Sequence, residues 1–182
     1  LCMNRVANPA TSPELDAVKS LLETQLRADF GNLSRRELRA HPVLQPYVEY
    51  FGRFDKTYPV QLQLESVVFK GKAIPRVAAL VEAMFMAELR NLLLTAGHDL
   101  EAVRGAVRVD VATGSESYTT LAGQSQRLKK GDMFVADEEG ILSSILYGPD
   151  RRTRIGPDTA RALFTTYAPR GVPQEKVRQH LV

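Results

Sequence analysis

Two short segments of the chain hold residue types that could carry out chemistry. In the first, His98 and Asp99 follow the small residues Thr95-Ala96-Gly97. A histidine ring titrates near neutral pH and can act as an acid, a base or a hydrogen-bond donor. An aspartate before Leu100 also suits the cap of a short helix. We therefore predict a capping role for Asp99 ahead of catalysis, and keep catalysis open for His98.

The second segment runs from Tyr147 to Thr153 and reads Tyr-Gly-Pro-Asp-Arg-Arg-Thr. Gly-Pro-Asp after an apolar strand is typical of a turn, and loops after strands often carry binding groups. The arginines that follow Asp150 could bind phosphate or carboxylate in a bidentate manner. A solvated turn is the alternative, and the residues alone favour it.

The signatures of the common catalytic and metal sites are missing from the sequence. Its one cysteine, Cys2, and its three widely spaced histidines predict no cysteine or histidine metal site. The sequence has no Walker loop, no dinucleotide fingerprint, no Gly-x-Ser-x-Gly elbow and no His-Glu-x-x-His. The acidic run 137–139 before Gly140 suits a hairpin turn better than a metal site. These residues alone indicate no particular reaction.

Composition places the chain among ordinary globular proteins. It has 182 residues, of which 44% are hydrophobic and 25% charged, as expected for one domain. No uncharged apolar run approaches the ~18 residues of a membrane span, and we expect a cytoplasmic protein. From Arg151 onwards seven basic residues face two acidic ones, against a net charge of +3 overall. That asymmetry suits an anionic partner, although scattered arginines also solvate a protein face.

The elements that must position these residues fall into two halves. Helical spacing covers about 13–30, a short stretch after Ser34, then 46–54, 59–70 and 76–94. Ser12 before Pro13 is an N-cap signal, Ser34 with Glu37 is a capping box, and the aromatic stripe in 46–54 indicates core. Strands are predicted at 107–111, with one wet face, and at 118–121, 133–136, 141–147 and 162–168, before a helix over 174–182. Helices followed by strands predict an α+β fold with a mainly antiparallel sheet.

The run from Ile74 to Pro169 resembles the B3/4 domain of the phenylalanyl-tRNA synthetase beta subunit, in its free-standing form. The resemblance rests on four motifs in order: Ile74-Pro75 with Leu80-Val81-Glu82; the turn 98–105; Gly123 with the strand 131–137; and 152–155 with Thr159 and Leu163-Phe164. It implies one domain, with a helical lead-in over 1–72 packed on the sheet, a B3/4-like core over 73–170 and a C-terminal helix over 171–182.

The resemblance implies proofreading, in which an ester bond between tyrosine and the phenylalanine tRNA is hydrolysed. The pocket would take the 3′ adenosine and the aminoacyl group and needs neither metal nor cofactor. The implied roles are that His98 orients water or the ester oxygen, Asp150 reads the polar group of the ligand, and Arg152 meets a phosphate. The other residues implied to contact the ligand are Glu82, Phe85, Thr95, Asp99, Tyr147, Thr153 and Thr159.

The sequence departs from the family pattern at several of these positions. Glu82 and Phe85 stand where the family helix has aspartate and asparagine, and the family histidine falls near Ala96. Asp150 meets a loop that carries a glutamate, and its side chain is one methylene shorter. The sequence hypothesis is a free-standing B3/4-type domain that binds a tRNA acceptor end or an aminoacyl ligand and hydrolyses misacylated tRNA in trans. The alternatives are a non-catalytic RNA- or protein-binding module and a sensor for a free amino acid or nucleoside.

Overall fold

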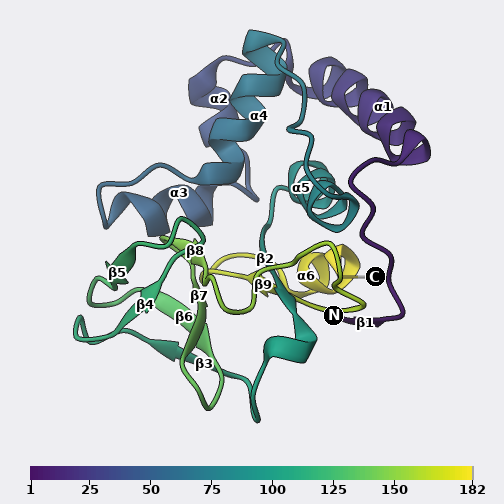
Figure 1. Cartoon of the computed structure of the whole chain (residues 1–182). Helices are drawn as coiled ribbons and strands as arrows, with labels where there is room; N and C mark the ends of the chain where they lie inside the picture. Colours follow the sequence, from purple (N-terminus) through teal and green to yellow (C-terminus); the bar gives the residue numbers. More distant parts are fainter. Residues whose placement is uncertain (182) are drawn as a thin grey trace. The chain divides into compact units, whose positions relative to one another are not determined.

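A computed structural model describes residues 1–181 of the chain. They form two compact units: the first joins Leu1–Asn8 to Ala96–Thr165, and the second joins Pro9–Thr95 to the segment from Thr166 onwards. The first unit holds β1 and the strands from β3 to β8, and the second unit holds the α-helices (Figure 1). The predicted α+β class with antiparallel strands is confirmed.

Most helices of the second unit begin and end where the local sequence signals predict. Ser12 accepts a hydrogen bond from the Leu15 N–H, and Ser34 and Glu37 form the predicted capping box. Within the predicted helix 13–30, Val18 is 54% exposed and Lys19 is buried beside it. Their bounds are Pro13–Phe30 (α1), Arg35–Arg39 (α2), Gln45–Gly52 (α3), Pro59–Lys70 (α4), Ala79–Asn91 (α5) and Gln174–His180 (α6).

Aromatic side chains form the centre of this unit. The rings of Tyr47 and Tyr58 stack with their centroids 4.3 Å apart, and Phe51 packs against Tyr58. The Tyr47 hydroxyl donates to the Tyr167 carbonyl over 2.5 Å, so the phenol is satisfied inside the core. The prediction that this stripe is core is confirmed by the burial of Tyr47, Tyr50 and Phe51.

The helix predicted over 76–94 is wrong at both ends. α5 begins at Ala79, and the Glu82 side chain accepts the N–H of Val77 in front of its first turn. The helix ends after Asn91 because Leu92 takes a left-handed φ of 61°. Residues Leu94–Asp99 then form strand β2, which was not predicted from the sequence. Gly97 suits this strand because a Cβ there would lie 2.8 Å from the Ile155 side chain.

The strands form three sheets in the described chain. One has the order β1 (Cys2–Asn4), β9 (Arg161–Tyr167) and β2, and β1 pairs with β9 in antiparallel fashion. The second runs β3 (Arg108–Val111), β6 (Met133–Ala136), β7 (Ile141–Ser144) and β8 (Gly148–Pro149) (Figure 1). The third is the hairpin of β4 (Ser117–Thr119) and β5 (Ser125–Arg127).

Four details of the strand predictions need correction. The strand predicted over 141–147 ends at Ser144, and the one predicted from 118 ends at Thr119. The polar strand β5 was not predicted, because Ser-Gln-Arg carries no apolar alternation. All four residues of β3 are exposed, so the alternating valines at 107, 109 and 111 mark an edge strand and do not face the core of this unit. That core is built from Ala112, Tyr118, Leu128, Phe134 and Ala136.

Candidate functional site

A chain of polar side chains runs through the interior of the first unit. His98, in β2, places Nδ1 2.8 Å from the Thr153 Oγ1 and Nε2 3.2 Å from the Ser143 Oγ. The Thr153 hydroxyl donates to a carboxylate oxygen of Asp150, which also accepts the Thr153 N–H over 3.0 Å. His98, Thr153 and Ser143 are each 0% exposed. The structure thus brings His98 and Asp150 into one network through Thr153.

The hydrogen bonds of this network fix the state of the imidazole. Because the Thr153 hydroxyl donates its hydrogen bond to Asp150, its oxygen must accept a hydrogen bond from the Nδ1–H of His98. The Nε2 of His98 is then the acceptor for the Ser143 hydroxyl. Burial, together with the smaller effect of the Arg152 charge, lowers the pKa of His98 to about 4, against the opposing charge of Asp137. His98 is therefore a neutral imidazole at pH 7, with its free electron pair on Nε2.

Asp150 and Arg152 lie beside one another at the end of the network. Asp150 is buried in the turn after β8, and this burial raises the pKa of its carboxyl group, against the opposing effects of Thr153 and Arg152. The Arg152 Nε lies 3.7 Å from Asp150 Oδ2, and its Nη2 lies 3.0 Å from Asp137 Oδ1. Arg152 also donates to the Ala102 carbonyl. The guanidinium predicted to meet a phosphate is thus already engaged by protein groups, with its side chain 26% exposed.

Asp99 and Thr159 form a second, adjoining pair. Thr159 Oγ1 donates to Asp99 Oδ2 over 2.8 Å and accepts the Gly156 N–H over 2.9 Å. Asp99 Oδ1 accepts the Glu101 N–H, so the predicted capping role of Asp99 is confirmed, although the capped turn is a 3₁₀ helix. The Asp99 N–H donates to the Thr153 carbonyl over 2.7 Å. This bond joins the pair to the His98 network.

The remaining predicted residues lie at other places in the fold. Tyr147, half-buried, packs against the core of the first unit. Glu82 is buried in α5, where its Oε2 lies 2.6 Å from the Lys19 Nζ. Phe85 is a half-buried residue of the same helix. Thr95 lies near the start of β2 and places its Oγ1 2.6 Å from His180 Nε2. Glu82, Phe85 and Thr95 belong to the second unit, whereas the His98 network belongs to the first.

Sequence reasoning missed two members of the network. Ser143 was read only as part of an apolar strand, although two adjacent serines in Ile-Leu-Ser-Ser are an unusual interruption of a buried run. Asp137 was read as a hairpin turn, which is confirmed by its bonds from the Glu139 and Gly140 N–H groups. Asp137 is also 1% exposed and bonded by Arg104 and Arg152. Burial opposes its ionisation, but these bonds together lower its pKa.

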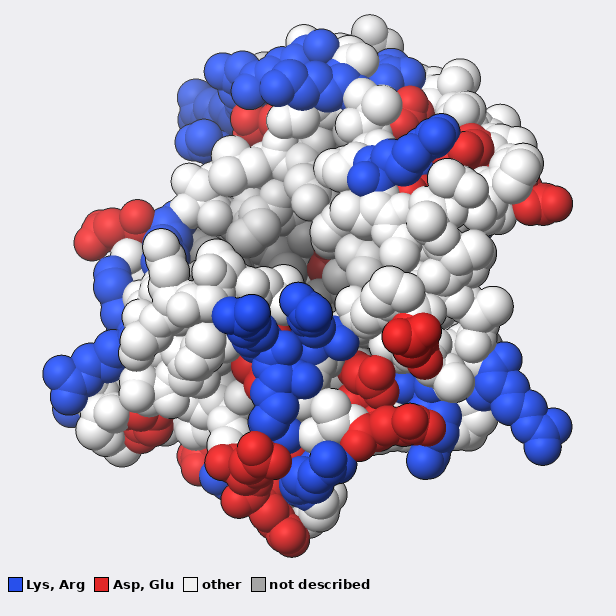
Figure 2. Space-filling model, viewed as in Figure 1, with Lys and Arg blue, Asp and Glu red and all other residues white. Residues whose placement is uncertain are grey.

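Basic and acidic side chains alternate over this part of the surface. Figure 2 shows them next to one another in the lower part of the view. Arg152 has carboxylates of Asp137, Glu139 and Asp150 within 3.7 Å. Arg151 and Arg154 are exposed on either side. The positive charge that the sequence concentrates after residue 150 is thus partly compensated at this site.

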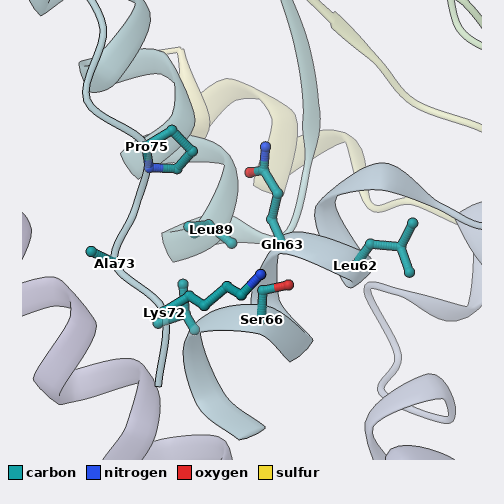
Figure 3. A pocket seen from close by; sticks show the side chains of 8 residues that line it. Leu62, Gln63, Ser66, Lys72, Ala73, Pro75 and Leu89 are labelled. Carbon is teal, nitrogen blue, oxygen red and sulfur yellow. The ribbon is translucent and has the colours of Figure 1, made fainter. Parts of the chain in front are cut away.

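A separate hollow lies in the second unit (Figure 3). It has a volume of about 260 Å³, and Val67 and Leu89 are among its apolar lining residues. Gln63, Ser66 and Lys72 supply its polar groups, and within the described residues no donor reaches the buried Oε1 of Gln63. Its lining, all within the described chain, is Leu62, Gln63, Ser66, Val67, Lys72, Ala73, Pro75 and Leu89, and includes none of the predicted site residues.

Comparison with known proteins gives a local similarity. No protein-family model matches the chain. The beta subunit of the phenylalanine–tRNA ligase of Mycoplasma pneumoniae is 30% identical over 67 residues, and that of Mycoplasma genitalium is 28% identical over 67 residues. Each match covers 37% of this chain and 8% of the subunit. The chain is therefore similar to a small part of these subunits.

A solved structure gives a weak match of the same kind. It is an N-terminal fragment of the phenylalanyl-tRNA synthetase beta subunit from Pyrococcus horikoshii, with a TM-score of 0.48 and 18% sequence identity. The match covers 56% of this chain and 37% of that one. Among the described helices of our chain, none combines the length and apolar character needed to cross a membrane. The described residues also contain no group of three or more histidine, cysteine or acidic side chains placed to hold a metal ion.

Proposed function

We propose that this chain is a B3/4-type domain that acts on the acceptor end of tRNA, and that it hydrolyses misacylated tRNA in trans. The observation that carries the proposal is the local similarity to the two phenylalanine–tRNA ligase beta subunits. The polar network around His98 supports it, because a neutral imidazole can hold water without a metal or a protein nucleophile. In this proposal residues 73–170 are the B3/4-like core, 1–72 the lead-in and 171–182 the closing helix.

The chemistry proposed for the network depends on its weakest bond. The contact between His98 Nε2 and Ser143 Oγ, at 3.2 Å, is longer than the 2.8 Å contact between Nδ1 and Thr153. When the Ser143 hydroxyl turns away, Nε2 can accept a proton from a water that attacks the ester carbonyl. The protonated ring then returns this proton to the tRNA hydroxyl that leaves as the ester bond breaks. Thr153 and Asp150 keep the Nδ1 proton in place and so hold the ring in its reactive tautomer.

In this proposal the solvent exposure of each side chain decides whether it contacts the ligand or supports a residue that does. The half-buried Asp99, Tyr147 and Arg152 meet the ligand, with Arg152 exchanging a carboxylate partner for a tRNA phosphate. Thr159 orients Asp99, and Asp150 reads the polar group of the amino acid through its second oxygen. Glu82, Phe85 and Thr95 are proposed as further ligand contacts through the resemblance alone.

The test is a deacylation assay on a panel of mischarged tRNAs. We expect the wild-type chain to release the amino acid from at least one member, and His98→Gln and Asp150→Asn to lose that activity. Thr165→Val is the matched control, because the Thr165 hydroxyl is buried without a partner among the described residues. No release above buffer across the panel at high protein concentration would remove the enzymatic part of the proposal.

A non-catalytic RNA-binding module is the second candidate. It is favoured by the complete burial of His98, Thr153 and Ser143, which in this conformation bond only to one another and to their protein neighbours. Binding of tRNA that weakens steeply with salt, without release of the amino acid, would select this function.

A sensor for a small molecule is the third candidate, and the hollow of Figure 3 favours it. Its volume of 260 Å³ equals that of roughly eight or nine water molecules. A hydrogen-bond donor of a ligand would satisfy the buried Gln63 Oε1, which has no partner among the described residues. Saturable binding of a free amino acid that Gln63→Leu abolishes, with no affinity for RNA, would select this function.

A further inference from the structure

Strand β3 is an outer strand with an exposed apolar face. In the sheet order β3-β6-β7-β8, the described chain places a neighbour on one side of β3 only. Val107, Val109 and Val111 are 43%, 70% and 55% exposed. Natural proteins usually protect such an edge, because its unpaired backbone N–H and C=O groups can form hydrogen bonds with a strand of another molecule. An edge that carries three exposed valines needs an explanation.

The open side of β3 can be identified from its hydrogen bonds. The Ala112 N–H donates to the Asp132 carbonyl, and the Ala112 carbonyl accepts the Gly131 N–H, so Ala112 directs its backbone toward the β6 side. Backbone directions alternate along a strand, so Val109 and Val111 direct theirs away from β6. The Val111 N–H is bound by the side chain of the preceding Asp110, over 2.7 Å. This bond is local and holds that N–H until a partner strand replaces it.

The sequence of the strand is complementary to itself. If two copies pair in antiparallel register about Val109, Arg108 of each faces Asp110 of the other. Val107 then faces Val111, and Val109 faces its own copy. The Arg108–Asp110 pairs fall at positions without backbone hydrogen bonds, where facing side chains lie closest. Arg108 already donates its Nη1 to the Asp137 carbonyl, but a guanidinium has donors left for a carboxylate.

We propose that β3 is a homodimer interface, in which two copies of this chain join their four-stranded sheets into one. The dimer is isologous, with its two-fold axis at Val109. The five residues 107–111 supply one apolar stripe of valines and two reciprocal ion pairs. An interface of one strand is small, so the dimer is weak and forms at high protein concentration.

Charge-swap variants test the register directly. Arg108→Asp places two carboxylates opposite each other at both ends of the paired strands, and Asp110→Arg places two guanidinium groups opposite each other there. We expect each change to weaken dimerisation about tenfold, as measured by sedimentation equilibrium from micromolar to millimolar protein. In a mixed dimer of the two variants, one chain carries aspartate and the other carries arginine at both positions 108 and 110, so only oppositely charged side chains face each other. In the proposed register each Arg108→Asp chain meets the introduced arginine of its partner, so the mixed dimer regains one ion pair of reversed polarity and keeps the original pair.

The mixture therefore separates a lost interface from a lost fold. We expect the two variants together to form a mixed dimer about as tightly as the wild type associates with itself. A variant that had merely misfolded could not recover this association when its counterpart is added. Association that stays as weak in the mixture as in either variant alone would contradict the proposed register.

A second variant tests the backbone pairing. Val109→Pro removes an N–H that points to the open edge and spares the bonds to β6, so a monomer with an unchanged unfolding temperature is expected. Raising the salt concentration should also weaken the wild-type dimer, because its ion pairs are exposed. The proposal is overturned if the wild type stays monomeric at millimolar concentration, or if the charge-swapped chains do not associate with each other. Either result would show that β3 does not pair with a second copy of this chain, and a strand of a different protein would then be the candidate partner for this edge.

Discussion

His98 and Thr153 lie 55 positions apart in the sequence, and their Nδ1 and Oγ1 atoms meet 2.8 Å apart inside the first unit. The pair joins β2 to the turn after β8, and through Thr153 it reaches the carboxylate of Asp150. Each polar group in this network forms a hydrogen bond with its neighbour, and these bonds offset the free energy lost when polar groups are removed from water. The network is therefore a structural element in its own right, whatever chemistry it serves.

Replacing Thr153 by valine tests that structural role. The shape of the side chain is kept, but the His98 Nδ1–H and the Asp150 carboxylate both lose their partner. We expect the free energy of unfolding to fall by about 2 kcal/mol, as seen for buried groups left unsatisfied. Urea unfolding followed by circular dichroism measures it.

The matched control is Thr165→Val. It makes the same substitution at a threonine of the same unit whose buried hydroxyl lacks a partner among the described residues. Because no hydrogen bond is lost, this change should leave stability unchanged or raise it. Equal losses for Thr153→Val and Thr165→Val would show that the network contributes nothing beyond packing.

The burial of His98 predicts how stability depends on acid. Its pKa is lowered from 6.5 to about 4 in the folded chain, chiefly by burial. As the pH falls, His98 therefore takes up a proton in the unfolded chain before it does so in the folded chain. Its contribution to the free energy of unfolding is full above pH 6.5 and is lost as the pH falls toward 4. We expect about 3 kcal/mol from this residue over that range. Unfolding free energies measured at pH 7, 6, 5 and 4 give the slope.

A His98→Gln variant serves as the reference for this titration. Glutamine lacks the titrating group, so its profile should be flatter than that of the wild type between pH 6.5 and 4. Parallel profiles for the two proteins would assign the acid sensitivity to other groups, of which the buried Asp150 is the nearest.

Local signals were sufficient to predict most of the helices, but neither the ends of α5 nor the site. Ser12 and the Ser34–Glu37 capping box act within a few residues, and they predicted where α1 and α2 begin. The segment 94–99 was not predicted as a strand, because its small residues at 95–97 follow a long helical pattern and show no apolar alternation. The segment is a strand because of its pairing in the sheet with β9, more than 60 positions away, which no local pattern contains.

The same limit applies to the residues that could do chemistry. His98, Asp150 and Thr153 were selected by type and by the resemblance, but their connection through Thr153 depends on where β2 and β8 end in space. Ser143 was missed because a serine in a strand has no spacing signal of its own. Likewise the alternating valines of β3 were read as a strand with one buried face, because alternation does not tell an edge strand from a central one.

Glu88 predicts a second pH dependence, of opposite direction. It is 3% exposed in α5, where burial raises its pKa from 4.5 to about 8, although the Thr95 N–H bond over 2.7 Å opposes this. The folded chain holds this proton more firmly than the unfolded chain, so its stabilisation is full below pH 4.5 and is lost as the pH rises through 8. Glu88→Gln keeps an acceptor for Thr95 and cannot ionise. The unfolding free energy of this variant should therefore fall less than that of the wild type between pH 6 and 9, and identical profiles would rule out Glu88 as the titrating group.

Glu82 offers a test that separates a structural role from ligand binding. Its carboxylate lies 2.6 Å from Lys19 Nζ, and both side chains are less than a tenth exposed. Glu82→Ala leaves the buried Lys19 ammonium with Asp16 as its remaining carboxylate partner, so the unfolding free energy should fall by about 3 kcal/mol, at the lower end of the loss for a broken buried pair. Urea unfolding of the variant beside the wild type measures the loss.

The control for Glu82 is Arg76→Ala, which breaks the pair between Arg76 and Asp16, where the Arg76 side chain is 62% exposed. An exposed pair of this kind contributes less than about 1 kcal/mol, so this variant should unfold almost as the wild type does. Lys19 keeps its second carboxylate, Asp16, at 3.1 Å in the Glu82 variant, which limits the loss. If Glu82→Ala instead matched Arg76→Ala in stability and weakened only the binding of an aminoacyl ligand, Glu82 would be a ligand contact and not a support of the helix packing.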